Sequence, residues 1–191
     1  MENRITRERA HEILMKYMEG ENYIQHSYAV EAIMKGLAKR LAPDDEEYWG
    51  CVGLLHDLDE EQCDWRNDMS VHGPTSVEIL KKEGIDDKEL GDAIKAHNPK
   101  CGMKAKTKLQ YSILAADPMS GFVKAVAQIY PDKKIASVKH KSVMKRFNEL
   151  RFASGANRDY MEMIEFTGLS LDDLIDIALE EMGAIAEALG L

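Results

Sequence analysis

The chain has 191 residues, of which 45% are hydrophobic and 31% are charged, and its formal net charge at pH 7 is −9. This composition is typical of one folded domain with a sizeable core, and the negative charge argues against general binding to nucleic-acid polymers. No apolar run approaches the roughly 18 residues of a membrane span, so we expect a single domain, residues 1–191, with no membrane partner.

Apolar residues recur with helical periodicity along the whole chain, and no useful length alternates as a strand does. Gly, Pro, Asn and Asp residues separate the periodic stretches, as turn chemistry predicts. The spacing predicts helices over residues 5–19, 24–42, 46–57, 71–83, 87–97, 107–130, 138–149, 156–167 and 170–189. Ser170 and Asp173 form a capping-box pattern at the start of the last helix. We therefore expect an all-α fold.

The three cysteines, Cys51, Cys63 and Cys101, show no Cys-x-x-Cys spacing. An odd number of cysteines without a metal-binding pattern indicates free thiols in a reducing compartment. The start of the chain is charged and helix-like, unlike a secretory signal. These features favour a cytoplasmic protein.

Charge is unevenly distributed along the chain. Residues 95–158, here called the basic segment, hold 14 Lys and Arg against 3 Asp and Glu, whereas residues 159–191 hold 9 acidic residues and no Lys or Arg. Residues 1–94 are also acidic overall. The basic segment can pair with the acidic termini, or part of it can face an anionic substrate, and the sequence leaves both interpretations open.

Ionisable side chains stand at core-facing positions of several predicted helices. His56 follows Trp49 and Val52 at the spacing i, i+3 and i+7, where a core residue is expected. Comparable inward positions hold His26, His72, His97 and Asp117. One such histidine is usually a core residue, but buried carboxylates need a partner, and several imidazoles with two carboxylates favour one or two divalent ions such as Fe, Mn, Zn, Co or Ni. The charged surroundings of His11 and His140 predict surface positions.

The adjacency of His56 and Asp57 restricts where a shared metal can lie. Neighbouring side chains on a helix diverge by about 100°. Both can therefore reach one metal cluster only beside a helix end, or if the carboxylate bridges two ions.

In their order and separations, His26, His56-Asp57 and Asp117 resemble the HD-domain superfamily of metal-dependent phosphohydrolases. The resemblance implies an all-α HD-domain helical bundle with additional C-terminal helices, and it implies that these four residues bind one metal. It covers about residues 22–130.

Members of that superfamily with two further histidines bind a second metal, and His72 and His97 occupy those places. Asp57 would then bridge the two ions. The remaining residues, about 131–191, would form a C-terminal helical extension. The stretch that begins "ADPMSGFVKAV" resembles a subfamily of predicted HD hydrolases without a firm substrate.

Two departures from the family pattern stand out. Many members continue the doublet with an apolar residue, Gly and Lys, whereas Leu58, Asp59 and Glu60 follow here. A lysine contact to substrate is therefore missing at that place. We interpret residues 59–61 as a solvated acidic turn, the alternatives being ligand orientation or a general base. Some two-metal members carry paired late histidines where this chain has His97-Asn98.

The resemblance implies a phosphohydrolase that uses a metal-activated water, with His56 and Asp57 as catalytic residues. The expected substrate is a small phosphorylated metabolite, most simply a nucleotide, with Lys124 and Arg158 as candidate substrate contacts. Two alternatives remain: a di-iron oxygenase of the same superfamily, and a non-catalytic nucleotide-binding module. The apolar stripe of residues 170–189 can pack within the domain or form a homodimer.

Overall fold

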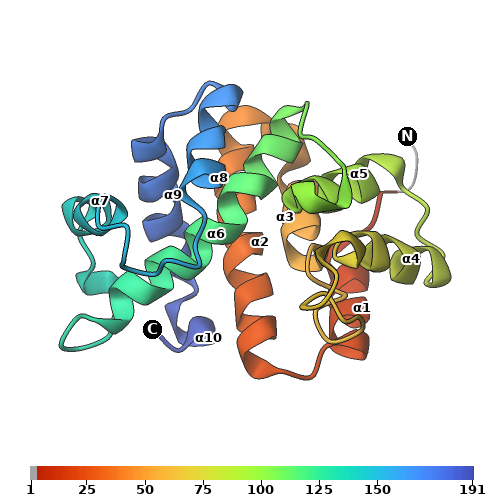
Figure 1. The fold of residues 1–191 in the computed structure, drawn as a ribbon, viewed down its shortest axis with the longest axis horizontal. Coiled ribbons are helices and arrows are strands. Elements are labelled where there is room, and N and C mark those ends of the chain that lie inside the picture. Colours follow the sequence, from red (N-terminus) through yellow and green to blue (C-terminus); the bar gives the residue numbers. More distant parts are fainter. Residues whose placement is uncertain (1–3) are drawn as a thin grey trace.

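The computed structural model describes residues 4–191 and, within that range, contains helices and loops without strands (Figure 1). The α-helices are α1 (Arg7–Tyr17), α2 (Glu21–Leu41), α3 (Glu46–Leu55), α4 (Pro74–Lys82), α5 (Lys88–His97), α6 (Lys108–Gln128), α7 (His140–Phe147), α8 (Arg158–Glu162), α9 (Leu171–Ala184) and α10 (Ala186–Leu189). Short 3₁₀-helices are η1 (Pro43–Asp45), η2 (Met69–Val71), η3 (Pro99–Cys101), η4 (Ile135–Ser137) and η5 (Met163–Thr167). The prediction of an all-α fold is confirmed.

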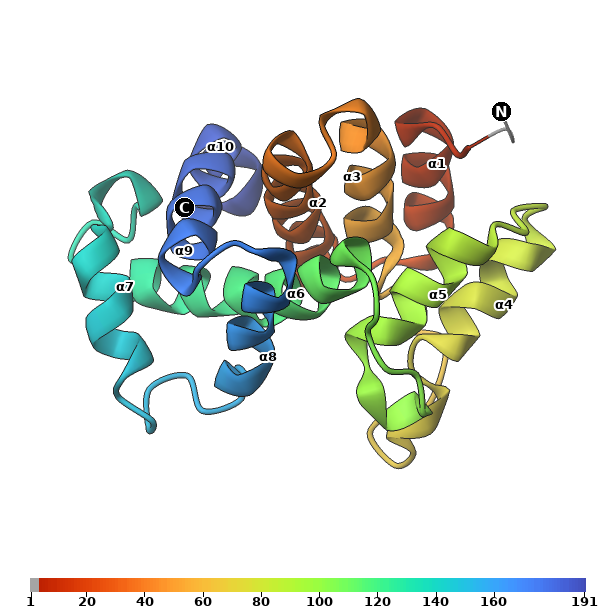
Figure 2. The ribbon, with the colours of Figure 1, turned by 90° about the horizontal axis from the view of Figure 1, so that it is seen from above.

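The two longest helices, α2 and α6, form the centre of the molecule. Figure 2 shows α1, α3, α2 and α9 side by side, with α6 crossing beneath α9, α2 and α3. The α4–α5 pair lies at one end of α6, α7 lies at the other end, and α8 lies beside the middle of α6. None of the described helices is both long and apolar enough to cross a membrane.

A glycine sets the close approach of α2 and α3. A Cβ added at Gly53 would lie 2.8 Å from the Val30 carbonyl oxygen, closer than a real Cβ atom comes to backbone. The two helix backbones can therefore meet at this point only without a side chain. This contact brings the C-terminal end of α3 against the middle of α2.

The core is made by side chains that the helical periodicity places inward. Ile33 and Leu37 of α2, Leu54 of α3 and Phe122 of α6 are all completely buried. Burying each such side chain stabilises the fold by about 1.5–3 kcal/mol. The central helices are thus well fixed, which allows them to carry polar groups at defined positions.

Several predicted helix bounds differ from the structure. The capping box of Ser170 and Asp173 is confirmed, but the last helix breaks at Ile185 into α9 and α10. The predicted helix 71–83 begins only at Pro74, because Gly73 has a φ of 89° that a helix cannot contain. His72 therefore lies in the turn before α4.

Candidate metal centre

His56 and Asp57 directly follow α3, and turns replace the helix after Leu55. The His56 side chain is completely buried, and its Nδ1 donates a hydrogen bond to the Gly53 carbonyl at 2.8 Å. His56 Nε2 then lies 3.2 Å from Asp57 Oδ1. The doublet stands at a helix end, one of the two geometries in which both side chains can reach the same cluster.

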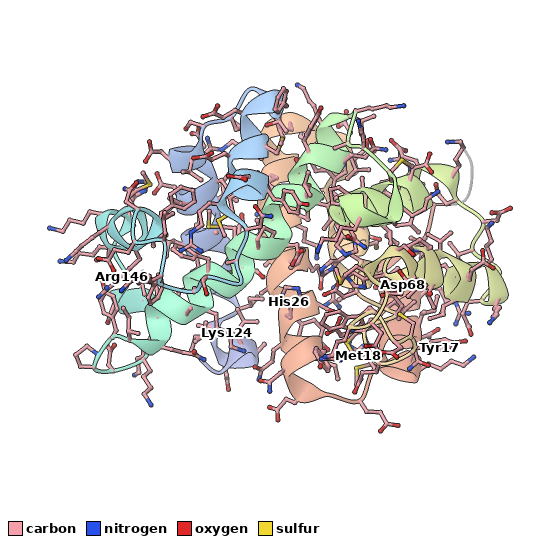
Figure 3. All side chains as sticks on the ribbon, viewed as in Figure 1. Tyr17, Met18, His26, Asp68, Lys124 and Arg146 are labelled. Carbon is pink, nitrogen blue, oxygen red and sulfur yellow. The ribbon has the colours of Figure 1, made fainter. Side chains whose placement is uncertain are left out.

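Helices α2 and α6 bring His26 and Asp117 to this doublet. His26, near the centre of the view in Figure 3, places its Nε2 at 3.3 Å from Asp57 Oδ2 and 3.2 Å from Asp117 Oδ1. His26 Nδ1 lies 3.1 Å from Ser120 Oγ, whose own hydroxyl donates to the Asp117 carbonyl. Since that hydroxyl proton is already used, His26 Nδ1 is the donor. His26 Nε2 therefore faces the two carboxylates, donating to them when the ring is protonated and offering its lone pair to a metal ion when the ring is neutral.

His72 and His97 complete the cluster from the α4–α5 pair. Each Nε2 lies 3.3 Å from Asp57 Oδ1, and the two Nε2 atoms lie 2.9 Å apart. His72 Nδ1 donates to the Asp59 carboxylate at 2.9 Å, and His97 Nδ1 donates to the Ile94 carbonyl. Both rings therefore direct Nε2 at each other and at Asp57.

The four imidazoles thus follow the same pattern. In each ring Nδ1 is hydrogen-bonded to a carbonyl, carboxylate or hydroxyl oxygen, and Nε2 points into the cluster. Two groups of ligand atoms result, His26–His56–Asp57 and Asp57–His72–His97, each with all atoms within 4.8 Å of one another. His56 Nε2 and Asp57 Oδ1 are buried without a hydrogen-bond partner among the described residues, which is costly unless a cation binds there. The residues fit one or two divalent metal ions.

The electrostatics of the cluster favour cations. Burial lowers the pKa of His26, but hydrogen bonds and charges of Asp117 and Asp57 outweigh it and raise the pKa to about 9. A similar balance raises the pKa of His56 to about 10. Burial raises the pKa of both carboxyls, yet the surrounding imidazoles hold the pKa of Asp57 and that of Asp117 below the usual range. The carboxylates therefore stay ionised and attract protons or metal ions.

The family model of the HD domain matches residues 23–138, more than half of the chain. The chain belongs to the HD domain family. HD domains are mostly metal-dependent hydrolases and bind divalent metals, in agreement with the two ligand groups around Asp57. No curated protein and no solved structure matches the chain. The resemblance to the HD-domain superfamily is confirmed.

Here the six residues His26, His56, Asp57, His72, His97 and Asp117 are called the HD site. A carboxylate behind it corrects the interpretation of residues 59–61 as a solvated acidic turn at one position, Asp59, whereas Glu61 is exposed. Asp59 is completely buried, and its Oδ2 accepts hydrogen bonds from the backbone N–H groups of Gly73 at 2.7 Å and Ser76 at 3.2 Å. Its Oδ1 accepts the His72 Nδ1 proton. A carboxylate in this position fixes the tautomer and orientation of the imidazole.

A cavity of about 560 Å³ opens over the HD site. His26, His72, His97 and Asp117 line its floor, and its walls come from the chain after α5, from α6 and from residues 153–160. Cavities of this size hold small metabolites. The cavity therefore gives a small ligand direct access to the HD site.

The two basic residues predicted as substrate contacts lie outside the lining of this cavity. Lys124 Nζ donates to Gln25 Oε1 at 2.9 Å, and Figure 3 shows Lys124 to one side of His26. Arg158 donates to backbone carbonyls within residues 152–156. In this structure both cations are engaged by the protein itself, and their contact with substrate stays a prediction.

Sequence reasoning missed the polar residues that do line the walls. These are Lys100, Asn98, Asn157 and Tyr160. Lys100 and Asn157 are exposed residues next to turns, where the default interpretation is solvation. The one available signal was the position of Lys100, three residues after His97.

The ion pairs of the basic segment are few. Among the described residues, two of its basic side chains form ion pairs with a carboxylate: Lys95 pairs with Asp92 and Arg146 with Glu149, each three residues away. Only the His140 imidazole joins the segment to the acidic α9, through two aspartates. Pairing of the basic segment with the acidic termini is therefore limited to Lys95 with Asp92 and His140 with α9, and its other Lys and Arg, apart from Arg146, form no ion pair among the described residues.

Proposed function

We propose that this HD-domain protein is a metal-dependent phosphohydrolase that acts on a small phosphorylated metabolite, with a nucleotide as the expected kind. The observation that carries the proposal is the pair of ligand groups sharing Asp57 on the floor of the cavity. In this proposal His26, His56, Asp57 and Asp117 hold one divalent ion, and Asp57, His72 and His97 hold a second.

Paired divalent ions lower the pKa of water and polarise a phosphoryl oxygen, which is the chemistry they would supply here. The chain itself prepares the site. Asp57 and Asp117 stay ionised, and the anchored Nδ1–H groups keep the four Nε2 lone pairs directed inward. Lys100 on the cavity wall adds positive charge that favours an anionic substrate.

The test measures metal content and phosphate release in the same preparations. Wild type is purified without chelator and compared with Asp57→Ala, and with Asp44→Ala as a control at an exposed carboxylate in η1. We expect about one or two divalent ions per chain in wild type and in the control. Both should release phosphate from p-nitrophenyl phosphate or from members of a nucleoside monophosphate panel. Asp57→Ala should lose metal and activity together.

Other outcomes separate the alternatives. Iron with oxygen consumption and no phosphate release would favour the di-iron oxygenase. Nucleotide binding without turnover in the metal-loaded protein would favour a binding module. Failure of wild type to take up Mn, Fe, Co, Ni or Zn would overturn the metal site and the hydrolase together.

The proposed partner is a small phosphorylated substrate rather than a polymeric nucleic acid, which the net charge of −9 opposes, and rather than a membrane. The apolar stripe of α9 supports packing within the domain over a homodimer. Leu174, Ile175 and Ala178 are completely buried in the single chain. We expect the protein to elute as a monomer in size-exclusion chromatography. Elution at the volume of a dimer would favour the homodimer instead.

A further inference from the structure

The first wall of the cavity carries a single positive charge that no neighbour neutralises. Lys100 follows α5 and is exposed, and no carboxylate of the described residues lies within ion-pair distance of it. Lys95, only five residues earlier, is paired with Asp92. The Lys100 ammonium group is therefore open to a ligand in the cavity.

At the second wall, residues 153–160, the Arg158 side chain already occupies several backbone carbonyls. The Arg158 guanidinium donates to the carbonyls of Phe152, Ala153 and Ala156, and it stacks over the Phe122 ring at 4.6 Å. These three carbonyls are therefore used by Arg158 rather than offered to a ligand.

Two polar side chains of this wall, Asn157 and Tyr160, have N–H or O–H groups free to donate. Asn157 Oδ1 accepts the Tyr160 backbone N–H at 3.1 Å, which leaves the Asn157 amide N–H groups without a partner among the described residues. The Tyr160 hydroxyl likewise forms no hydrogen bond with another described residue. Outside the HD site, no lining residue is acidic. Both walls thus favour a ligand rich in acceptors and negative charge.

We propose that the cavity binds substrates that carry a second anionic group, a phosphate or a carboxylate, beyond the group held at the HD site. Lys100 neutralises this second group, and Asn157 and Tyr160 donate hydrogen bonds to the ligand from the opposite wall. The inference rests on the proposed function only in placing one phosphoryl group at the HD site.

Phosphonates test this proposal, because phosphoester hydrolysis does not cleave their C–P bond. Calorimetry on the metal-loaded protein compares carboxyalkyl phosphonates of increasing length, from phosphonoacetate to 4-phosphonobutyrate, with alkyl phosphonates of equal length. The proteins are wild type, Lys100→Gln and, as a matched control, Lys104→Gln, since Lys104 is also exposed and unpaired but lies outside the cavity lining. Metal content of each preparation verifies that the HD site is intact.

For one length of the ligand's carbon chain, wild type and Lys104→Gln should bind the carboxylated phosphonate about tenfold more tightly than the alkyl phosphonate. A tenfold difference is the size expected for one charge-assisted hydrogen bond. In Lys100→Gln the ratio should fall to near one, and in Tyr160→Phe it should fall by a smaller factor. Equal affinity for both ligands in wild type, or an unchanged ratio in Lys100→Gln, would overturn the proposal. If the affinity ratio falls in Lys100→Gln but the wild type hydrolyses no phosphoester, this inference stands and the proposed function fails. If the wild type hydrolyses phosphoesters but the affinity ratio is the same in Lys100→Gln, the proposed function stands and this inference fails.

Discussion

The Asp59 carboxylate, completely buried, accepts the Nδ1 proton of His72 at 2.9 Å. This contact places a second layer of negative charge behind the HD site. It links the turn after α3 to the turn before α4, and it determines which nitrogen of His72 faces Asp57.

The substitution Asp59→Asn should therefore weaken metal binding without touching a ligand atom. We expect affinity at the group formed by Asp57, His72 and His97 to fall by about 10- to 100-fold. The free energy of unfolding should fall by about 2 kcal/mol, because an amide cannot accept all three hydrogen bonds of the carboxylate. Metal titration and urea unfolding measure the two effects. Asp44→Asn is the control, and an unchanged metal affinity in Asp59→Asn would contradict the role assigned to Asp59.

Trp65 offers an optical signal for the same group of ligands. Its ring centroid lies 6.0 Å from that of His72, whereas Trp49 is buried in α3. Cobalt(II) or nickel(II) bound near His72 should quench Trp65 fluorescence. The quenching should disappear in Trp65→Phe and persist in Trp49→Phe. The opposite pattern would show that the ions bind elsewhere.

Glu83 should contribute to stability in a pH-dependent way. Hydrogen bonds from Lys16 and Tyr17 lower the pKa of Glu83 from 4.5 to about 2, and Arg9 also pairs with it, so the residue joins α1 to the end of α4. A lowered folded-state pKa stabilises the protein above the unfolded value of 4.5 and loses its effect as the pH falls toward 2.

The comparison of wild type with Glu83→Gln in urea at several pH values measures this contribution. The difference in unfolding midpoint should be largest at neutral pH and should vanish as the pH approaches 2. Glu78→Gln, at an exposed carboxylate of α4, should give no such trend. A difference that stays constant between pH 7 and pH 3 would rule out the carboxylate charge as its source.

Arg158 should act on the cavity through residues 152–156. Arg158→Met removes hydrogen bonds to three carbonyls and should lower the free energy of unfolding by about 2 kcal/mol. With an active substrate, KM should rise while kcat changes little, since the HD site is not altered. Arg151→Met is the matched control at an exposed arginine. A large loss of kcat with an unchanged KM would instead place Arg158 at the reacting group.

The helical periodicity predicted the fold class and the inward positions of His26, His56 and His97, because both depend on spacing along the chain, whereas His72 is inward from a turn held by Asp59. His26 and Asp117 are 91 positions apart, and the structure places them 3.2 Å from each other. Asp59 was misjudged because three consecutive acidic residues normally lie in water, and only the tertiary contacts with Gly73 and Ser76 reveal its burial.

The cavity walls could not be predicted in the same way. Lys100 and Tyr160 come from different parts of the chain, and no period connects them. Arg158 was chosen for its charge, yet its partners are backbone carbonyls, which leave no trace in the identities of residues 152–156.

The match to the HD family ends at residue 138, while one wall of the cavity is made by residues 153–160. The floor and that wall are thus encoded in separate stretches of the chain. Replacing residues 153–160 would change the shape of the cavity without changing the HD-site residues on its floor. Only this later wall is separate, however, because Asn98 and Lys100 of the other wall lie between the HD-site residues His97 and Asp117.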